Sequence, residues 1–228
     1  MPGLFKELLN LLYPPLCVVC GSKLIEGEEQ LCSACLYDLP RTRFHSDRQN
    51  PVAERMAGKL PFEKATACFH YQKESHLQII MESFKYKSNQ QLAFFLGNYA
   101  GMQLRKDGFF EQIDLLLPVP LHKNKEKWRG YNQSNLIARG LALQAGLPVD
   151  ISSLQRVVEN PTQTRRGLWE RSQNVQQIFR LNRPDSLADK HVLLVDDVLT
   201  SGSTMEACGN ALLEVSGLRL SFFALALA

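Results

Sequence analysis

The chain has 228 residues, of which 45% are hydrophobic, and it carries a formal net charge of +3 at pH 7. This length and apolar content suit one α/β domain with a small appendage. This positive charge is too small to indicate nucleic-acid binding by itself, so any basic surface must be local.

The N-terminal run 1–15 could be mistaken for a signal peptide, but polar residues interrupt it. Glu7 and Asn10 break the apolar run, and no cleavage site of small residues follows. Residues 4–12 are instead predicted to form a short amphipathic helix that a pair of prolines ends. Because no window of the sequence reaches about 18 uncharged apolar residues, we expect no membrane span.

Four cysteines follow in the spacing of a structural zinc site. They form two Cys-x2-Cys pairs separated by eleven residues: Cys17, Cys20, Cys32 and Cys35. Each pair on a tight turn aims two thiolates at one point, which predicts a zinc ribbon or knuckle within residues 1–40. An iron–sulfur cluster and two disulfides are the alternatives. A thiolate metal site favours a reducing compartment, so we expect the protein in the cytoplasm.

The segment 41–60 is polar and mixed in charge, which predicts a linker or a partly ordered segment before a larger domain over residues 61–228. That domain begins with a predicted strand at 65–71. Two helices with apolar side chains at helical spacing follow. The break between these helices contains Lys85-Tyr86-Lys87, which is either a surface grip or a solvated helix end.

Residues 113–120 predict a buried strand whose prolines lead into a basic loop up to residue 132. The loop holds four cations, a histidine, and the aromatic residues Trp128 and Tyr131. Aromatic residues interleaved with cations suit stacking on single-stranded nucleic acid. A solvated charged loop is the alternative interpretation.

A helix is predicted over 133–144 and a short strand over 155–158, before a second basic stretch. This stretch carries Arg165, Arg166 and Arg171, and charge and polarity dominate its composition. It is predicted to be a mobile flap that closes over an anionic ligand and excludes water. An ordinary exposed loop is the alternative.

The most informative stretch is 192–204. Four apolar residues predict a buried strand, Asp196 and Asp197 follow at its end, and a small hydroxylated loop opens a helix. The loop residues that can turn amides and hydroxyls onto a phosphate are Thr200, Ser201, Gly202, Ser203 and Thr204. The two carboxylates can accept hydrogen bonds from vicinal ribose hydroxyls or approach magnesium. A core strand ending in a polar turn is the alternative, and the sequence excludes a Walker A loop.

Strands alternate with helices through the larger domain, and no internal repeat is present. This order predicts an α/β fold with a mainly parallel sheet and helices on both faces. Ligands of such sheets bind at the carboxyl ends of the strands. Both the loop after residue 118 and the stretch after Asp196 begin at such ends.

The stretch 192–204 resembles, over its full length, the 5-phosphoribosyl-1-pyrophosphate (PRPP) signature of type I phosphoribosyltransferases. The resemblance implies that Thr200–Thr204 hold the 5′-phosphate and that Asp196 and Asp197 bind the ribose hydroxyls, with magnesium accompanying PRPP. It also implies a pyrophosphate-binding loop after the first strand of the fold. The residues placed there are Leu121, His122 and Lys123, with Arg129 as a second anion contact.

Nearly the whole chain resembles the ComF family, including its enterobacterial DNA-utilisation members. The resemblance rests on the four-cysteine module, on Pro118–His122 and Arg129–Gln133, on scattered positions from Gln163 to Phe179, and on the acidic signature. It implies a type I phosphoribosyltransferase fold and a role in the uptake or use of extracellular DNA. Single-stranded DNA and a DNA-uptake helicase or channel protein are the implied candidate partners.

The sequence shows no recognisable element for base specificity, because the N-terminal region is taken up by the metal module. The preferred interpretation is therefore a PRPP-binding accessory protein that contacts single-stranded DNA in the cytoplasm. An active phosphoribosyltransferase with an unidentified acceptor base is the first alternative. A scaffold that keeps the fold without binding the ligand is the second.

Overall fold

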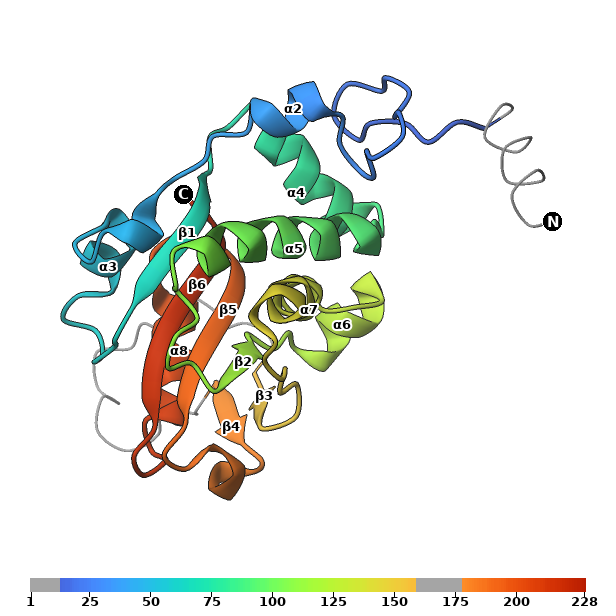
Figure 1. The fold of residues 1–228 in the computed structure, drawn as a ribbon. Helices are drawn as coiled ribbons and strands as arrows, with labels where there is room; N and C mark the ends of the chain where they lie inside the picture. The colour runs from blue at the N-terminus through green and yellow to red at the C-terminus, as the bar shows by residue number, and fades with distance from the viewer. Residues whose placement is uncertain (1–12, 159–177) are drawn as a thin grey trace.

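The computed structural model describes residues 13–158 and 178–228, and its centre is a four-stranded parallel sheet (Figure 1). The strands lie in the order β1-β6-β5-β2. Their bounds are Ala65–His70 for β1, Leu115–Pro118 for β2, His191–Leu199 for β5 and Arg219–Leu227 for β6. Side chains of β2, β5 and β6 are buried almost without interruption, as in a sheet covered on both faces. The predicted α/β class is confirmed.

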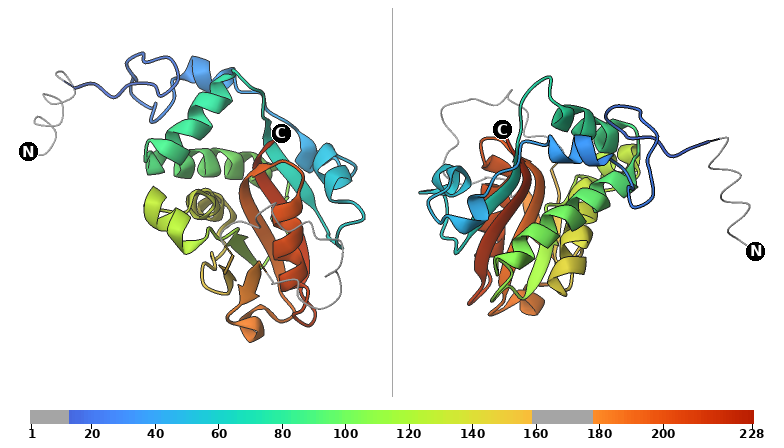
Figure 2. Two further views of the ribbon diagram at one scale, coloured as in Figure 1. Left: turned by 180° about the vertical axis from the view of Figure 1, so that it is seen from behind. Right: turned by 45° about the horizontal axis from the view of Figure 1, so that its top comes forward.

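Helices cover both faces of this sheet (Figure 2). One face packs against α4 (His76–Tyr86), α5 (Gln90–Lys106) and α7 (Gln133–Ala145), and the other packs against α3 (Pro51–Met56) and α8 (Ser203–Leu212). Alternate side chains of β5 enter opposite cores, with Leu193 and Val195 on the α5 side and Val192 and Leu194 on the α8 side. The two cores therefore hold β5 in a fixed register, which in turn fixes the side chains at its carboxyl end.

The remaining elements are short. They are α2 (Ser33–Tyr37), η1 (Phe44–Ser46), α6 (Lys123–Arg129), η2 (Pro184–Leu187), and an antiparallel pair made of β3 (Leu154–Arg156) and β4 (Phe179–Leu181). Among the described residues, no helix combines the length and the apolar character that crossing a bilayer requires.

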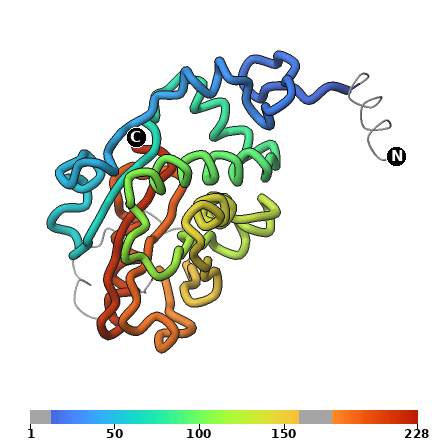
Figure 3. The backbone as a smooth tube through the Cα atoms, in the orientation of Figure 1, coloured from blue at the N-terminus to red at the C-terminus, as the bar shows by residue number. Residues whose placement is uncertain are grey.

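The segment 41–60, which the sequence predicts to be a linker, is ordered in the structure. It leaves the cysteine module alongside β1, where the Thr42 amide donates to the Cys68 carbonyl, and continues into η1 and α3 (Figure 3). Val52 and Met56 on α3 are fully buried against the sheet. This helix could not be predicted from the sequence, because the segment is mostly polar and a helix of two turns gives too short a periodic pattern of apolar residues.

The basic loop predicted after residue 118 is also different in the structure, because part of it forms α6. The His122 side chain accepts a hydrogen bond from the Asn124 amide and so caps the first turn. Gly130, at φ 84°, ends the helix in the left-handed conformation that glycine adopts freely. Two capping residues thus give helical structure to a sequence with no apolar stripe.

The first cysteine pair lies on a tight turn and the second pair begins α2. The Gly21 amide donates to the Cys17 carbonyl, while Cys32 Sγ accepts from the Cys35 amide at the start of the helix. Side chains from Leu24 and Leu31 join the core beside α4 and α5. The module is therefore packed onto the larger domain and is not merely tethered to it.

The four predicted zinc ligands converge. The sulfur atoms of Cys17, Cys20, Cys32 and Cys35 all lie within 4.8 Å of one another. Cys20 Sγ and Cys32 Sγ are 3.7 Å apart. Four thiolates bound at about 2.3 Å around a tetrahedral zinc ion lie about 3.8 Å from each other, so side-chain shifts of about 1 Å or less bring all four cysteines onto this metal.

Helices α5 and α7 approach each other closely because each carries a glycine at the contact. A Cβ on Gly97 would lie 2.2 Å from the Ile137 carbonyl oxygen, and a Cβ on Gly140 would lie 2.4 Å from the Phe94 carbonyl oxygen. Both obstacles are backbone atoms, which cannot rotate away. This contact brings the first turn of α7 to the carboxyl end of β5.

We expect Gly140→Ala to lower the free energy of unfolding by about 1–3 kcal/mol, because overpacking outweighs the better helix propensity of alanine. Gly209→Ala on α8 is the matched control, since the nearest atoms that a new Cβ would meet there are methyl groups at the ends of the Leu60 and Leu220 side chains. Urea denaturation of both variants measures the effect. Equal stability of the two variants would contradict the proposed backbone contact.

Removal of zinc is expected to unfold the module over residues 15–40, since structural zinc contributes on the order of 10 kcal/mol to small sites. Amide hydrogen exchange with and without a chelator measures this change. Exchange in β5 and β6 serves as the internal control and should rise far less. Unchanged protection of the module after metal removal would refute the zinc assignment.

Candidate functional site

A cavity of about 480 Å³ lies at the carboxyl ends of the parallel strands. Of the residues predicted to bind a phosphoribosyl ligand, those that line it are Leu121, Asp196, Asp197, Thr200 and Thr204. Residues predicted to bind the 5′-phosphate, the ribose and the pyrophosphate therefore line one cavity. Lys85, from the segment predicted to be a surface grip or a solvated helix end, also lines it, as do Gln133 and Arg156, which had no role assigned from sequence.

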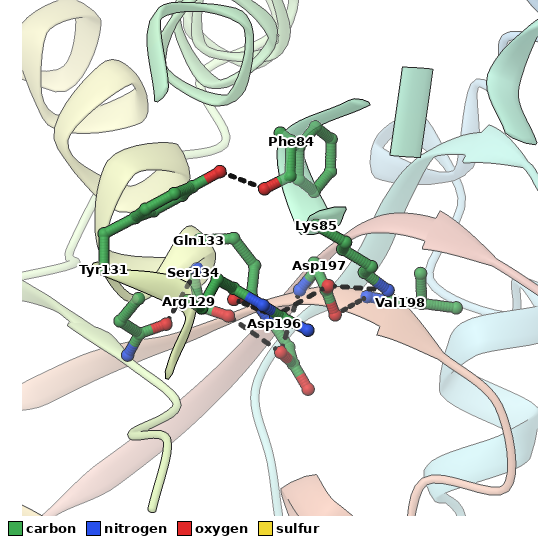
Figure 4. A network of polar contacts seen from close by, with 10 residues as sticks. Phe84, Lys85, Arg129, Tyr131, Gln133, Ser134, Asp196, Asp197 and Val198 are labelled. Carbon is green, nitrogen blue, oxygen red and sulfur yellow. Dashed lines mark hydrogen bonds and ion pairs between the residues drawn. The ribbon is translucent and has the colours of Figure 1, made fainter. Parts of the chain in front are cut away.

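The two acids form the centre of a polar network (Figure 4). Asp196 Oδ1 accepts a hydrogen bond of 2.9 Å from Ser134 Oγ. Asp197 Oδ2 accepts one of 3.2 Å from Gln133 Nε2 and lies 2.8 Å from Lys85 Nζ. Ser134 and Gln133 belong to the first turn of α7, so the close packing of that helix positions both donors.

The acids lie within β5 and not after it. The predicted strand ends at Val195, whereas the observed strand continues to Leu199 because its pairing with β6 extends to that residue. Asp197 is buried and Asp196 is half-buried. Burial, reinforced by the negative charge of Asp197, raises the pKa of Asp196 to about 7. Near neutral pH, the pair therefore holds a proton that a cation or a ligand can displace.

The hydroxylated loop leads directly into α8. Gly202, at φ 82°, occupies the N-cap position and supplies no capping side chain; the Ser203 amide makes a long hydrogen bond of 3.4 Å to Ser201 Oγ. Ser201 Oγ and Ser203 Oγ are 2.7 Å apart, and both residues are exposed along with Thr200 and Thr204. An uncapped helix N-terminus with neighbouring hydroxyls is an arrangement that binds phosphate.

Two basic side chains, one on α3 and one just after it, donate hydrogen bonds to backbone carbonyls of this loop. Arg55 Nη1 donates to the Thr200 carbonyl at 2.7 Å, and Lys59 Nζ donates to the Ser201 carbonyl. Both donors come from the segment predicted to be a linker, so sequence reasoning missed them. No motif or periodicity in that segment marks either residue.

The predicted pyrophosphate loop is only partly brought to the cavity. Leu121 lines it, whereas His122 caps α6 and Lys123 is an exposed residue in the first turn of that helix. Arg129, at the other end of α6, donates to Gln133 Oε1 at 2.6 Å. It therefore acts on Asp197 through Gln133 and does not line the cavity itself.

The last turn of α4 supplies a cation to the acids. Lys85, named from sequence as part of a surface grip, instead points into the cavity toward Asp197 (Figure 4). The Tyr131 hydroxyl donates to the Phe84 carbonyl and so ties this turn to the segment before α7. The sequence offered one signal for Lys85, its place in a basic break between two helices.

The predicted flap residues Arg165, Arg166 and Arg171 lie outside the described residues, as does the helix predicted over 4–12. The four cysteines lie apart from the cavity lining and serve the N-terminal module. The described site therefore consists of the acids, the hydroxylated loop, and the cations and amides that surround them.

Two family models match the chain. The model described as a double zinc ribbon domain matches residues 8–69, and the model described as a phosphoribosyl transferase domain matches residues 132–226. The first match includes all four cysteines, and the second includes the acids and the hydroxylated loop.

Curated relatives are proteins of DNA utilisation and competence. DNA utilization protein YhgH of Escherichia coli O157:H7 is 25% identical over 87% of this chain and 84% of the relative. Competence protein F of Haemophilus influenzae is 28% identical over 84% and 75%, respectively. Competence protein ComFC of Bacillus subtilis is 32% identical over 44% of this chain and 38% of the relative.

Among solved structures, adenine phosphoribosyltransferase from Saccharomyces cerevisiae is similar with a TM-score of 0.40 and 15% identity, covering 78% of this chain and 88% of the enzyme. The family models and the curated relatives agree with the two parts seen in the structure. The comparisons therefore support the ComF family for this chain, in which a zinc-ribbon part is followed by a phosphoribosyltransferase-type part.

Proposed function

We propose that this chain binds PRPP with magnesium and acts as an accessory protein in the uptake or use of external DNA. The observation that carries the proposal is that Asp196, Asp197 and the uncapped start of α8 share one cavity. Paired acids suit vicinal hydroxyls, and an open helix N-terminus suits a phosphate. A ribose 5-phosphate presents both groups at the two ends of one molecule.

Each part of the site has a role in this proposal. Thr200–Thr204 hold the 5′-phosphate with amides and hydroxyls, and Asp196 and Asp197 accept hydrogen bonds from the ribose hydroxyls. Magnesium bound to the pyrophosphate group of PRPP would supply positive charge, and Asp196 and Asp197 are the carboxylates that could approach it. Gln133 and Ser134 orient the carboxylates through the hydrogen bonds already present.

The second part of the proposal concerns DNA and location. The names of the relatives concern DNA utilization and competence, and the chain carries local clusters of cations despite its small net charge. We propose contact with single-stranded DNA and, through it, with a DNA-uptake helicase or channel protein. The thiolate zinc site and the lack of a disulfide among the six cysteines, all of which lie in the described residues, favour a reducing compartment, so the proposed location is the cytoplasm.

Transfer of the phosphoribosyl group to a base is the second candidate function. It is favoured by the reach of the cavity from the acids to Leu121, which is the side proposed for pyrophosphate. Release of pyrophosphate from PRPP in the presence of a panel of bases would establish it. No release across the panel, together with PRPP binding, would leave the accessory role.

PRPP with magnesium should stabilise the wild-type protein by about 2.7 kcal/mol at a hundredfold excess over the dissociation constant. Asp197→Asn should abolish this gain, because the carboxylate that accepts from the ribose is lost. Thermal unfolding with and without ligand measures it, each variant being compared with its own baseline. Asp185→Asn, at an exposed residue of η2, is the control and should respond as wild type does. A full response from the Asp197 variant would refute the ribose assignment.

Affinity for PRPP with magnesium should rise as the pH increases through about 7. The reason is that the pKa of Asp196 is raised to about 7, so the carboxyl is protonated below that pH and accepts hydrogen bonds less well. Calorimetric titration across this range measures the change. Asp196→Asn removes the titrating group and should flatten the part of the profile that the protein contributes. An identical profile for wild type and variant would contradict the assignment.

A further inference from the structure

Two exposed aromatic rings meet beside the cavity although they are far apart in the sequence. Tyr86 ends α4 and is 64% exposed, and Trp128 lies on α6 and is 72% exposed. Their ring centroids are 6.4 Å apart with the ring planes at 66°. The Arg129 guanidinium lies 5.8 Å from the centroid of the Tyr86 ring. We call Tyr86, Trp128 and Arg129 the aromatic platform.

The platform is continuous with the proposed PRPP site. Tyr86 lines the same cavity as the two acids, and the preceding residue, Lys85, reaches Asp197. Arg129 is connected to Asp197 through Gln133. The exposed rings therefore stand at the mouth of the cavity, on the same turn of α4 that supplies its cation.

The charge around the platform is strongly positive although the net charge of the whole chain is only +3. The basic residues on α6 and at the end of α4 are Lys85, Lys87, Lys123, Lys125, Lys127 and Arg129. The acids near them are Glu126 on α6, Glu82 on α4 and, inside the cavity, Asp197, which pairs with Lys85. Such a surface attracts a polyanion, while its exposed rings offer flat apolar faces.

We propose that the aromatic platform binds single-stranded nucleic acid, with a base stacked on Trp128 or Tyr86 and the backbone lying along the cations of α6. The assignment rests on the proposed contact with single-stranded DNA and gives that contact a location. Rings accept the face of any unpaired base, whereas a duplex hides these faces within its own stack. A free base carries no phosphate group and therefore cannot form ion pairs with the cations of α6.

The position of the platform also indicates how PRPP and single-stranded nucleic acid would lie relative to each other. The acids and the phosphate loop lie inside the cavity, whereas the rings lie at its mouth. A strand that crosses the platform leaves the start of α8 accessible to a phosphate. The two ligands can therefore occupy the protein together, with Lys85 and Tyr86 as neighbours between them.

Binding of a short oligothymidylate, followed by fluorescence anisotropy, tests the platform on the full chain. Trp128→Ala and Tyr86→Ala should each weaken binding roughly 5- to 100-fold, which corresponds to the loss of one stacked base. Trp128→Phe should retain most of the affinity, because it keeps a ring. The matched control is Tyr37→Ala, which removes another exposed tyrosine that lies beside an arginine guanidinium, on α2.

A spectroscopic signature separates stacking from a general loss of affinity. The chain has two tryptophans, Trp128 and Trp169, so Trp169→Phe leaves Trp128 as the single tryptophan. Oligothymidylate should quench its fluorescence, and duplex DNA of the same length should quench it less. The affinity should fall with salt at a log–log slope of about −0.7 for each phosphate neutralised.

Several outcomes would overturn the inference, and they differ from failure of the proposed function. If wild type binds the oligonucleotide and the platform variants bind equally well, the location is wrong and the DNA contact stands. If wild type binds no single strand, the DNA part of the function fails as well. Equal loss in Tyr37→Ala, or equal affinity for thymidine monophosphate and the oligomer, would also refute the platform. The PRPP-induced stabilisation of the two Trp128 variants, whose side chain does not line the cavity, should equal that of wild type and shows that they fold.

Discussion

The site depends on keeping two adjacent carboxylates close together at the carboxyl end of a buried strand. Neighbouring negative charges that are poorly solvated repel each other, and three features of the structure reduce this repulsion. Lys85 supplies a positive charge, the first turn of α7 supplies two hydrogen bonds, and Asp196 retains a proton up to about neutral pH. The backbone contact between α5 and α7 brings that turn within reach.

The N-terminal part of the chain is structurally coupled to the ligand site. After the cysteine module, the backbone follows the edge strand β1 and forms α3, from which Arg55 donates to the Thr200 carbonyl. Lys59 does the same at Ser201. The segment 41–60 thus supports the hydroxylated loop directly, and its apolar residues complete the core beneath α8.

The predictable parts of the fold were those with a strong local pattern. The apolar run before Asp196, the alternation of strands and helices, and the two cysteine pairs each follow from short-range chemistry, and the structure and the comparisons agree with the fold they predicted. Helix α6, the ordered segment 41–60, and the cations Arg55 and Lys59 were missed. Capping and tertiary contacts determine these features, and such contacts join residues more than a hundred positions apart.

The ion pair between Lys85 and Asp197 has a consequence for how any ligand arrives. The acids already have an ammonium group as counter-ion, so an incoming metal–ligand complex exchanges one cation for another instead of filling an uncompensated negative site. The ammonium lies on the last turn of α4, where the next side chain is the exposed tyrosine. The counter-ion of the buried acids and an aromatic ring of the outer surface are therefore separated by a single peptide bond.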